Sequence, residues 1–115
     1  MNAIVMPRPA YEDSLMQINF PDDKPAFDGA NLTVRFMARV EGEAVICAIT
    51  AEALEDHFGA ESALETALMA AFDKGRQRIR SVCAEALDQN NGEGVVLHSG
   101  LFRVEGMEPD RGATA

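Results

Sequence analysis

The stretch LTVRFMARVEGEAVICAIT, residues 32–50, contains the pattern that decides the fold. Apolar side chains recur at every second position of its first half, which is typical of a strand with one face on the core. The core-facing set is Leu32, Val34, Phe36, Ala38 and Val40. The return strand 44–49 is apolar on both faces, which indicates a central strand or a covered second face. Gly42 can adopt the positive φ of a tight turn, so the stretch predicts a β-hairpin.

The hairpin runs into CAITAEALEDHFG, residues 47–59, which holds a cysteine and a histidine. One interpretation is a catalytic thiol with its base, and the other is a core strand followed by a capped helix. Thr50 can cap a helix by accepting backbone N–H groups two or three residues on, and Gly59 suits the helix end. Cys47 shares its strand face with apolar residues, where the pKa of a thiol rises and its reactivity falls. We therefore expect a strand and a short helix, and no catalytic pair of Cys47 with His57.

A second helix is predicted by Ser62 and Glu65, which form the S-x-x-E pattern of a capping box. Apolar residues then recur at helical spacing as far as Leu87, and residues 90–92, Asn-Asn-Gly, indicate the stop. Gly75 lies on the apolar stripe, although a glycine inside a helix costs roughly 1 kcal/mol relative to alanine. We expect the close approach of another backbone to compensate for this cost.

Shorter strand patterns flank these elements. They are MQINF at 16–20, GVVLHS at 94–99 and LFRVE at 101–105, while 21–31 is expected to be a loop. The predicted fold class is α+β, with a mainly antiparallel sheet of three to five strands packed by one short and one long helix. The predicted organisation is a loose arm over 1–15, one α+β domain over 16–98, and a C-terminal extension over 99–115 whose last ten residues are expected to be disordered.

Composition excludes several classes of function. The 115 residues carry a net charge of −9, which repels a phosphate backbone and an anionic membrane surface. Tryptophan is absent and aromatics are 6%, so stacking platforms for nucleic acid are scarce. No apolar run approaches the ~20 residues of a membrane span, and residues 1–15 lack a signal peptide pattern. Because two cysteines make no disulfide framework, we predict a cytoplasmic protein with reduced thiols. The charge and the lack of an apolar span predict no membrane partner and count against a nucleic-acid partner.

Motifs for metal and cofactor binding are missing from the sequence. Neither C-x-x-C nor H-x-x-x-H occurs, and His57 and His98 are far apart in the chain. The glycine-rich phosphate loops and the G-x-S-x-G elbow are absent as well. We therefore expect no metal, no cofactor and no catalytic residue.

The run KGRQRIR, residues 74–80, is the one basic cluster in this acidic chain. Helical geometry puts Lys74 and Arg78 far from the apolar stripe and places Arg76 and Arg80 beside it. These two arginines can simply lay their stems over the core, or their guanidinium forks can bind an anion or an acidic peptide. Arg76 is the closer to the buried side, and we expect it to hold a carboxylate of the 22–28 loop. The candidates are Asp22, Asp23 and Asp28.

Several of these segments together resemble the YrdB-like family of short bacterial proteins, a domain of unknown function. They are INFPDDKPAFD (18–28), VRFMARVEGEAVICAITAEAL (34–54), Phe58, and Phe72 followed by Arg76. The family pattern reads F-P-D, an aromatic-Asp pair, C-x-I-S, E-[AS]-L and F-x-x-x-R. This chain departs from it at Phe27, where tryptophan is usual, at Thr50, where serine is usual, and in a longer C-terminal tail. The resemblance covers about 16–98 and implies a small α+β fold in a bacterial cytoplasm, with no activity to carry over.

Two main hypotheses of function follow, and a nucleic-acid role, carried only by the basic run 74–80, is the third. The first is a non-enzymatic protein-binding or regulatory module, which the doubly apolar strand 44–49 allows to act as a homodimer. The second is a small-ligand-binding domain or enzyme that uses an anion site at Arg76 near the 22–28 loop. The candidate binding residues are Phe27, Asp28, Arg76 and Arg80.

Overall fold

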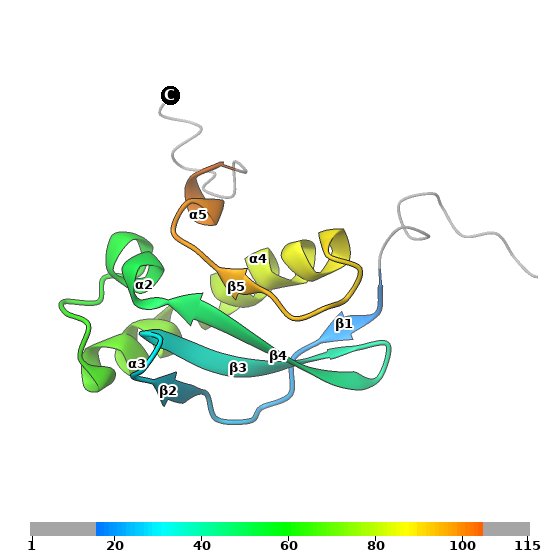
Figure 1. Ribbon diagram of the computed structural model, residues 1–115, viewed down its shortest axis with the longest axis horizontal. Helices are drawn as coiled ribbons and strands as arrows, with labels where there is room; N and C mark the ends of the chain where they lie inside the picture. Colours follow the sequence, from blue (N-terminus) through cyan, green and yellow to red (C-terminus); the bar gives the residue numbers. More distant parts are fainter. Residues whose placement is uncertain (1–15, 105–115) are drawn as a thin grey trace, which may run out of the picture.

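The predicted hairpin forms the centre of the sheet in the computed structural model, which describes residues 16–104 (Figure 1). The elements are β1 (Ile18–Asn19), β2 (Ala26–Asp28), β3 (Thr33–Val40), β4 (Glu43–Thr50), α2 (Ala51–His57), α3 (Glu65–Lys74), α4 (Arg76–Gln89), β5 (Val96–Leu97) and α5 (Leu101–Val104). The α+β class with a mainly antiparallel sheet is confirmed. The predictions for residues 1–15 and 106–115 lie outside the described residues.

The sheet has five strands, in the order β1-β3-β4-β5, and β2 also pairs with β3. Its pairs are antiparallel except β4 with β5, which is parallel. The hairpin turn consists of Glu41 and Gly42, both at positive φ (53° and 85°). Positive φ at both residues is typical of the two-residue turns whose twist matches that of the strands. The register opposes Phe36 to Cys47 and Val34 to Ile49, and the core-facing residues of β3 are Val34, Phe36, Ala38 and Val40. Leu32 corrects the prediction, because it lies before β3 at φ 51° and is 48% exposed.

Residues 26–28 correct one prediction, because they form β2 where a loop was expected. Phe27 pairs with Val34, and Asp28 pairs with Thr33. Three residues are too few to show an alternating pattern. They form a strand because they pair with β3, which lies outside the segment.

The helices α3 and α4 lie behind the sheet in the view of Figure 1 and cover its core face. The ring of Phe36 on β3 packs against Phe72 of α3, with centroids 5.3 Å apart. The other face of the sheet carries the alternate residues of β3 and β4, and Ile46 there is 55% exposed. The strand 44–49 is thus central, but its second apolar face is not covered within residues 16–104.

The connection from β4 to α2 agrees with its prediction. Thr50 is the N-cap, and its Oγ1 accepts from the N–H of Ala53 at 3.0 Å. The helix ends at Phe58, and Gly59 follows with φ 77°. The N–H of Ala60 then donates to the carbonyl of Leu54 at 3.1 Å and closes the end. The strand, threonine cap and short helix are therefore confirmed.

The long helix of the sequence prediction is divided in two at Gly75, which ends α3 and precedes α4. A Cβ at Gly75 would overlap the ring of Phe58 and lie 2.6 Å from its Cε1. The close neighbour is thus an aromatic side chain and not another backbone. Gly75 has φ −98° and ψ 14°, away from helical values, so the helix is interrupted there although the apolar stripe continues through the break.

The capping box does not form, which corrects a further prediction. The N-cap of α3 is Leu64, which makes no side-chain cap hydrogen bond. Ser62 Oγ instead accepts from the N–H of Leu64 at 3.3 Å, within the turn before the helix. Ser62 lies two residues before the N-cap position, too early to reach the first free N–H groups of α3.

The C-terminal part of the described chain is helical, whereas a strand or loose end was expected for LFRVE. Phe102 of α5 is fully buried and meets Phe58 edge-on at 5.3 Å. Ser99 Oγ donates to Asp56 Oδ2 at 2.6 Å, and the ring Nε2 of His57 lies 3.2 Å from the same hydroxyl. A four-residue helix is too short to show a period, so the contacts with α2 decide its structure.

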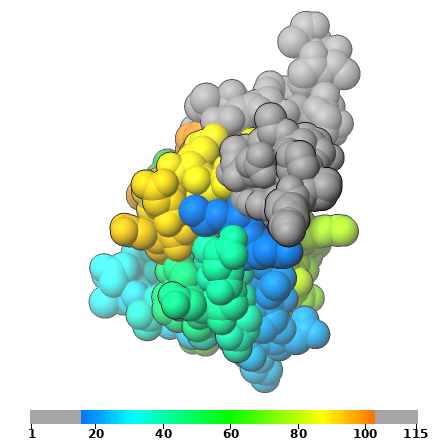
Figure 2. All heavy atoms as spheres, turned by 90° about the vertical axis from the view of Figure 1, so that its right-hand side faces the viewer, coloured from blue at the N-terminus to red at the C-terminus, as the bar shows by residue number. Residues whose placement is uncertain are grey.

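The opposite end of the molecule brings the start of the described chain against the hairpin turn. The N–H of Glu41 donates to the carbonyl of Gln17 at 2.8 Å. Figure 2 shows this end, with the residues that begin at Met16 in blue between the hairpin in green and the end of α4 in yellow. Asn91 and Gly92, both at positive φ, stop α4 as predicted, and a Cβ at Gly92 would lie 3.0 Å from Val40. This contact ties the end of α4 to the sheet.

Candidate functional site

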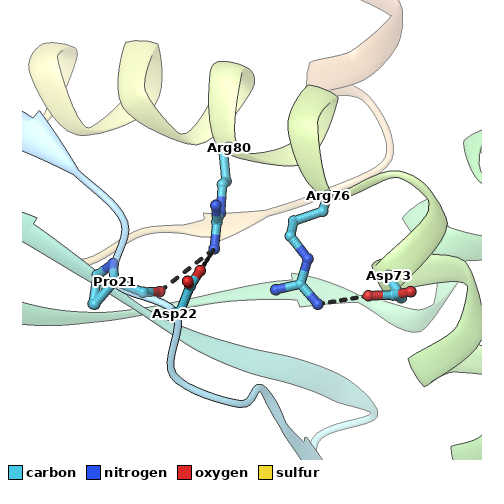
Figure 3. Close-up of polar contacts among 5 residues, drawn as sticks. All are labelled: Pro21, Asp22, Asp73, Arg76 and Arg80. Carbon is cyan, nitrogen blue, oxygen red and sulfur yellow. Dashed lines mark hydrogen bonds and ion pairs between the residues drawn. The ribbon is translucent and has the colours of Figure 1, made fainter.

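Two of the four candidate residues, Arg76 and Arg80, lie one turn apart on α4 and point to the same side, toward the segment that follows β1 (Figure 3). The guanidinium carbon of Arg76 is 5.3 Å from the ring centroid of Phe72. That of Arg80 is 5.6 Å from the ring of Phe20. A cation over an aromatic face gains about 0.5–1 kcal/mol at an exposed site, so both side chains are held in place.

The two supporting rings belong to one aromatic row. Phe36 of β3 stands between them, 5.3 Å from Phe72 and 6.4 Å from Phe20. The row joins the α3 helix, the sheet and the segment after β1, and carries one arginine at each end. The spacing of the two guanidinium groups is therefore fixed by the core and not by the flexible stems of the side chains. We call Arg76 and Arg80 on this row the arginine pair.

The carboxylates near the arginine pair are exposed. Arg76 Nη2 lies 2.7 Å from Asp73 Oδ1, and the Asp73 side chain is 74% exposed. Arg80 Nη2 lies 4.0 Å from Asp22 Oδ1, whose side chain is fully exposed, and donates to the carbonyl of Pro21 at 3.4 Å. Exposed ion pairs contribute about 0–1 kcal/mol, so an external carboxylate can compete with these partners. The arrangement can bind an anionic group without loss of a buried contact.

These contacts correct the expected pairing of Arg76. A carboxylate from the 22–28 loop was expected to bind Arg76, but Arg76 binds Asp73 of its own neighbouring turn. The loop carboxylate that does approach α4 is Asp22, and it approaches Arg80. Asp73 and Arg76 are three residues apart, a spacing that brings side chains together on a helical surface, so this local pair forms in place of the pair with the loop.

The other two candidates, Phe27 and Asp28, lie elsewhere. Phe27 is half-buried and packs against the core. Asp28 accepts from the side-chain and backbone N–H groups of Asn31, at 2.9 Å and 3.2 Å, and lies 3.9 Å from Arg35 Nε. The hydrogen bonds from Asn31 are the main cause that holds the pKa of Asp28 below its ordinary value. Among residues 16–104, no hydrogen bond or ion pair joins Asp28 to the arginine pair, so the predicted set divides into two places.

Arg78 also departs from its expected position. It was placed with Lys74, away from the apolar stripe, but its guanidinium lies over the rings of Phe58 and Phe102, at 5.4 Å and 5.6 Å. Lys74 and Arg78 belong to two different helices, so the 100° rotation per residue of one continuous helix does not relate their directions. In addition, α5 contributes Phe102 to the surroundings of Arg78. The basic run therefore has its three arginines on aromatic rings. The composition of the run gave no signal of this, because the rings come from distant segments.

Cys47 and His57 have different partners. Cys47 and Cys83 are both buried and hydrogen-bond to each other between β4 and α4, while the His57 ring lies 3.1 Å from the carbonyl oxygen of Ser99. The hydrogen bond from Cys83 lowers the pKa of Cys47 to about 7, which corrects the expected rise. The same hydrogen bond, together with burial, raises the pKa of Cys83. Cys47 therefore lies in the core and pairs with Cys83, and His57 pairs with Ser99 and not with Cys47.

Over residues 16–104, no three side chains of the histidine, cysteine, aspartate or glutamate type gather closely enough to hold a metal ion. None of the helices in this range combines the length and the apolar character needed to cross a membrane.

Comparisons with known proteins agree on a family. None of the curated proteins compared with the chain matches it. A crystal structure of a protein of unknown function from the DUF1488 family, from Shewanella loihica PV-4, superposes with a TM-score of 0.60 over 70% of this chain and 92% of that chain. At 19% identity this likeness shows the fold alone. The model of the family described as "Protein of unknown function (DUF1488)" matches residues 18–97, most of the sequence. The chain therefore belongs to the DUF1488 family, a family of small proteins whose function is not known.

Proposed function

We propose that this protein is a non-enzymatic protein-binding or regulatory module, and that the arginine pair binds an acidic segment of its partner. The observation that carries this proposal is the fixed position of the two guanidinium groups over Phe72 and Phe20, with exposed carboxylates as their partners. A binding group that is ordered before it meets its ligand loses less side-chain entropy on binding.

The chemistry of arginine favours a carboxylate-bearing partner. The planar fork of a guanidinium matches two carboxylate oxygens, and two forks one helical turn apart match acidic side chains on one partner segment. The net charge of −9 opposes the approach of an acidic partner at long range. Salt screens that repulsion more than it screens a hydrogen-bonded contact, so the binding should weaken less with added salt than binding to a wholly basic surface.

The test uses a short Glu-Ser repeat peptide and a Gln-Ser counterpart, each titrated by calorimetry. We expect the acidic peptide alone to bind, and the double substitution Arg76→Gln with Arg80→Gln to weaken it by at least about tenfold. Arg39→Gln is the matched control, because Arg39 is an exposed arginine on β3, away from the arginine pair. Equal binding of the two peptides, or an equal loss in the control, would refute the proposal. Thermal unfolding of each variant shows that it is folded.

The alternative is a small-ligand-binding domain or enzyme with an anion site at the arginine pair near the 22–28 loop. The contact of Arg80 with Pro21 and Asp22 supports it, because an anion that displaced Asp22 would lie between α4 and this loop. Titration with inorganic phosphate separates the two candidates. Saturable shifts of the Arg76 and Arg80 side-chain NMR signals with phosphate, and none with the acidic peptide, would favour the alternative.

Four further properties belong to this proposal. A homodimer is supported by the exposed apolar side chain of Ile46, and hydrodynamic mass at high concentration tests it. A cytoplasmic location is supported by the free thiols of Cys47 and Cys83. A bacterial origin is supported by the bacterial source of the similar structure. The YrdB-like name is supported by the motifs that run from INFPDDKPAFD to Arg76.

A further inference from the structure

The outer face of the sheet, which the helices leave uncovered, contains a hollow of about 510 Å³. The residues that line it from β3 and β4 include Thr33, Arg35, Ile46, Ala48 and Thr50. In the strand register these positions alternate with the buried core residues, which confirms that the hollow lies opposite α3 and α4. Pockets of about 300–1,000 Å³ hold small organic ligands, so the size suits a small molecule.

One side of the hollow is apolar. Ile46 and Val96 line it and are 55% and 45% exposed, although most large apolar side chains of the described chain are buried. Ala48 pairs with Val96 across β4 and β5 and forms the floor between them. A ligand with an apolar body would remove these side chains from water, with a gain of about 25 cal/mol per Å².

The other side is polar and carries a cation. Arg35 Nε lies 3.9 Å from Asp28, and the Arg35 side chain is about half exposed. Its two Nη atoms make no hydrogen bond with any residue in the range 16–104. Asp28 is fixed by Asn31, whose hydrogen bonds favour the ionised carboxylate, and both Asp28 and Arg35 line the hollow. The exposed imidazole of His98 also lines the hollow, at the β5 edge and two residues after Val96.

The rim of the hollow depends on a close backbone approach at Gly94. A Cβ at Gly94 would overlap the carbonyl oxygen of Ile46. The loop before β5 can therefore lie against the edge of β4 only because this residue lacks a side chain. Strand pairing holds β3, β4 and β5 together under the hollow. The close approach of Gly94 to Ile46 holds the rim against β4.

We propose that the hollow binds a small amphipathic carboxylate. Its carboxylate accepts hydrogen bonds from the Arg35 fork, and its apolar body lies on Ile46, Ala48 and Val96. This site is separate from the arginine pair, since it is on the opposite face of the sheet and does not involve α4. The protein would then have two binding faces, one for an acidic protein segment and one for a small molecule.

The test titrates hexanoate into the isotope-labelled protein and follows backbone amide NMR signals, with acetate and 1-hexanol as probes that lack the body or the charge. We expect hexanoate to shift the signals of β3, β4 and β5 around the hollow, with a Kd on the order of 1 mM. Arg35→Gln should raise that Kd about tenfold, because a charged hydrogen-bond fork is lost. Arg39→Gln is the matched control, on the same strand and face but outside the hollow, and should leave the Kd within about twofold.

Three outcomes would overturn the inference. They are the absence of saturable shifts with hexanoate, equal affinity for acetate, and an equal loss in Arg35→Gln and Arg39→Gln. Ile46→Gln provides a second variant that does not touch the Asp28 contact, and it should raise the Kd for hexanoate without changing the response to acetate. The arginine pair variant, Arg76→Gln with Arg80→Gln, should bind hexanoate like the native protein, so failure of this site is distinguishable from failure of the proposed function.

Discussion

The two faces of the sheet hold their arginines in different ways. On the helix side, Arg76 and Arg80 lie over aromatic rings, and their side chains are about 30% exposed. On the outer face, Arg35 has one long contact with Asp28 and is about half exposed. An arginine packed on a ring stabilises the fold and is fixed in position, whereas Arg35 contributes little to stability and keeps its fork available. The difference shows that the arginines on the helix side contribute to the stability of the fold, whereas Arg35 on the outer face contributes little.

The largest effect is expected from Phe36→Ala, compared with Ile46→Ala on the opposite face of the sheet. Phe36 is buried and links Phe72 to Phe20, so its removal should lower the free energy of unfolding by about 3–5 kcal/mol. Ile46 is more than half exposed, and its truncation should cost less than about 1 kcal/mol. Urea unfolding of both variants measures the two values. A cost for Ile46→Ala close to that of Phe36→Ala would mean that the outer face is covered in solution, as in a homodimer.

The next effect is expected from Gly75→Ala, where two physical terms have opposite signs. Helix propensity alone predicts that alanine stabilises by about 1 kcal/mol. The Cβ would however overlap the ring of Phe58, and overpacking of this kind costs about 1–3 kcal/mol. We expect net destabilisation in urea unfolding.

The double variant Gly75→Ala with Phe58→Leu separates these two terms. Leucine lacks the ring that the new Cβ would meet, so Gly75→Ala should cost less in this background than in the native protein. An equal cost in both backgrounds would place the strain elsewhere. The same pair tests whether the break between α3 and α4 depends on this one contact.

Sequence patterns predicted the central hairpin because its information is local. Alternation in β3, the turn at Gly42 and the cap at Thr50 each depend on neighbouring residues, and all three agree with the structure. The bend at Gly75 could not be located, since the apolar stripe continues through it and its cause is Phe58, seventeen positions earlier. The β2 strand and α5 were missed because three and four residues are too few to show a repeating strand or helix pattern.

The candidate site was predicted in part for the same reason. The spacing of Arg76 and Arg80 follows from helical geometry within one segment, and the structure places both on one side of α4. Their supports, Phe20 and Phe72, come from two other segments and required the tertiary structure. Arg35 was seen only as the exposed side of a strand, because its neighbours in the hollow, His98 and Val96, are distant in sequence.

A smaller effect compares the arginines directly by substitution with methionine, which keeps the apolar stem and removes the charge. Arg80→Met should lower the free energy of unfolding by about 0.5–1 kcal/mol, because the contact of the cation with Phe20 and the hydrogen bond to Pro21 are lost. Arg35→Met should change it by less than about 0.5 kcal/mol. Chemical unfolding of the two variants under the same salt checks the order. An equal cost would contradict the contrast between the two faces.

The smallest effect concerns the pKa of Asp28 and its contribution to the pH dependence of stability. The hydrogen bonds from Asn31 hold the pKa of Asp28 below its ordinary value of 3.8, so the ionised form is favoured in the folded state. A carboxyl whose pKa is lower in the folded than in the unfolded state adds stability above the unfolded pKa, and loses it as pH falls through the folded pKa. Asn31→Ala should therefore raise the pKa of Asp28 toward 3.8 when carboxyl carbon signals are followed by NMR. The stability difference between this variant and the native protein should shrink at acid pH, where Asp28 is protonated in both. Asn31→Ala removes the side-chain hydrogen bond but keeps the backbone N–H donor of residue 31. An unchanged pKa in this variant would therefore show that the backbone N–H or Arg35, and not the Asn31 side chain, is the main support of this carboxylate.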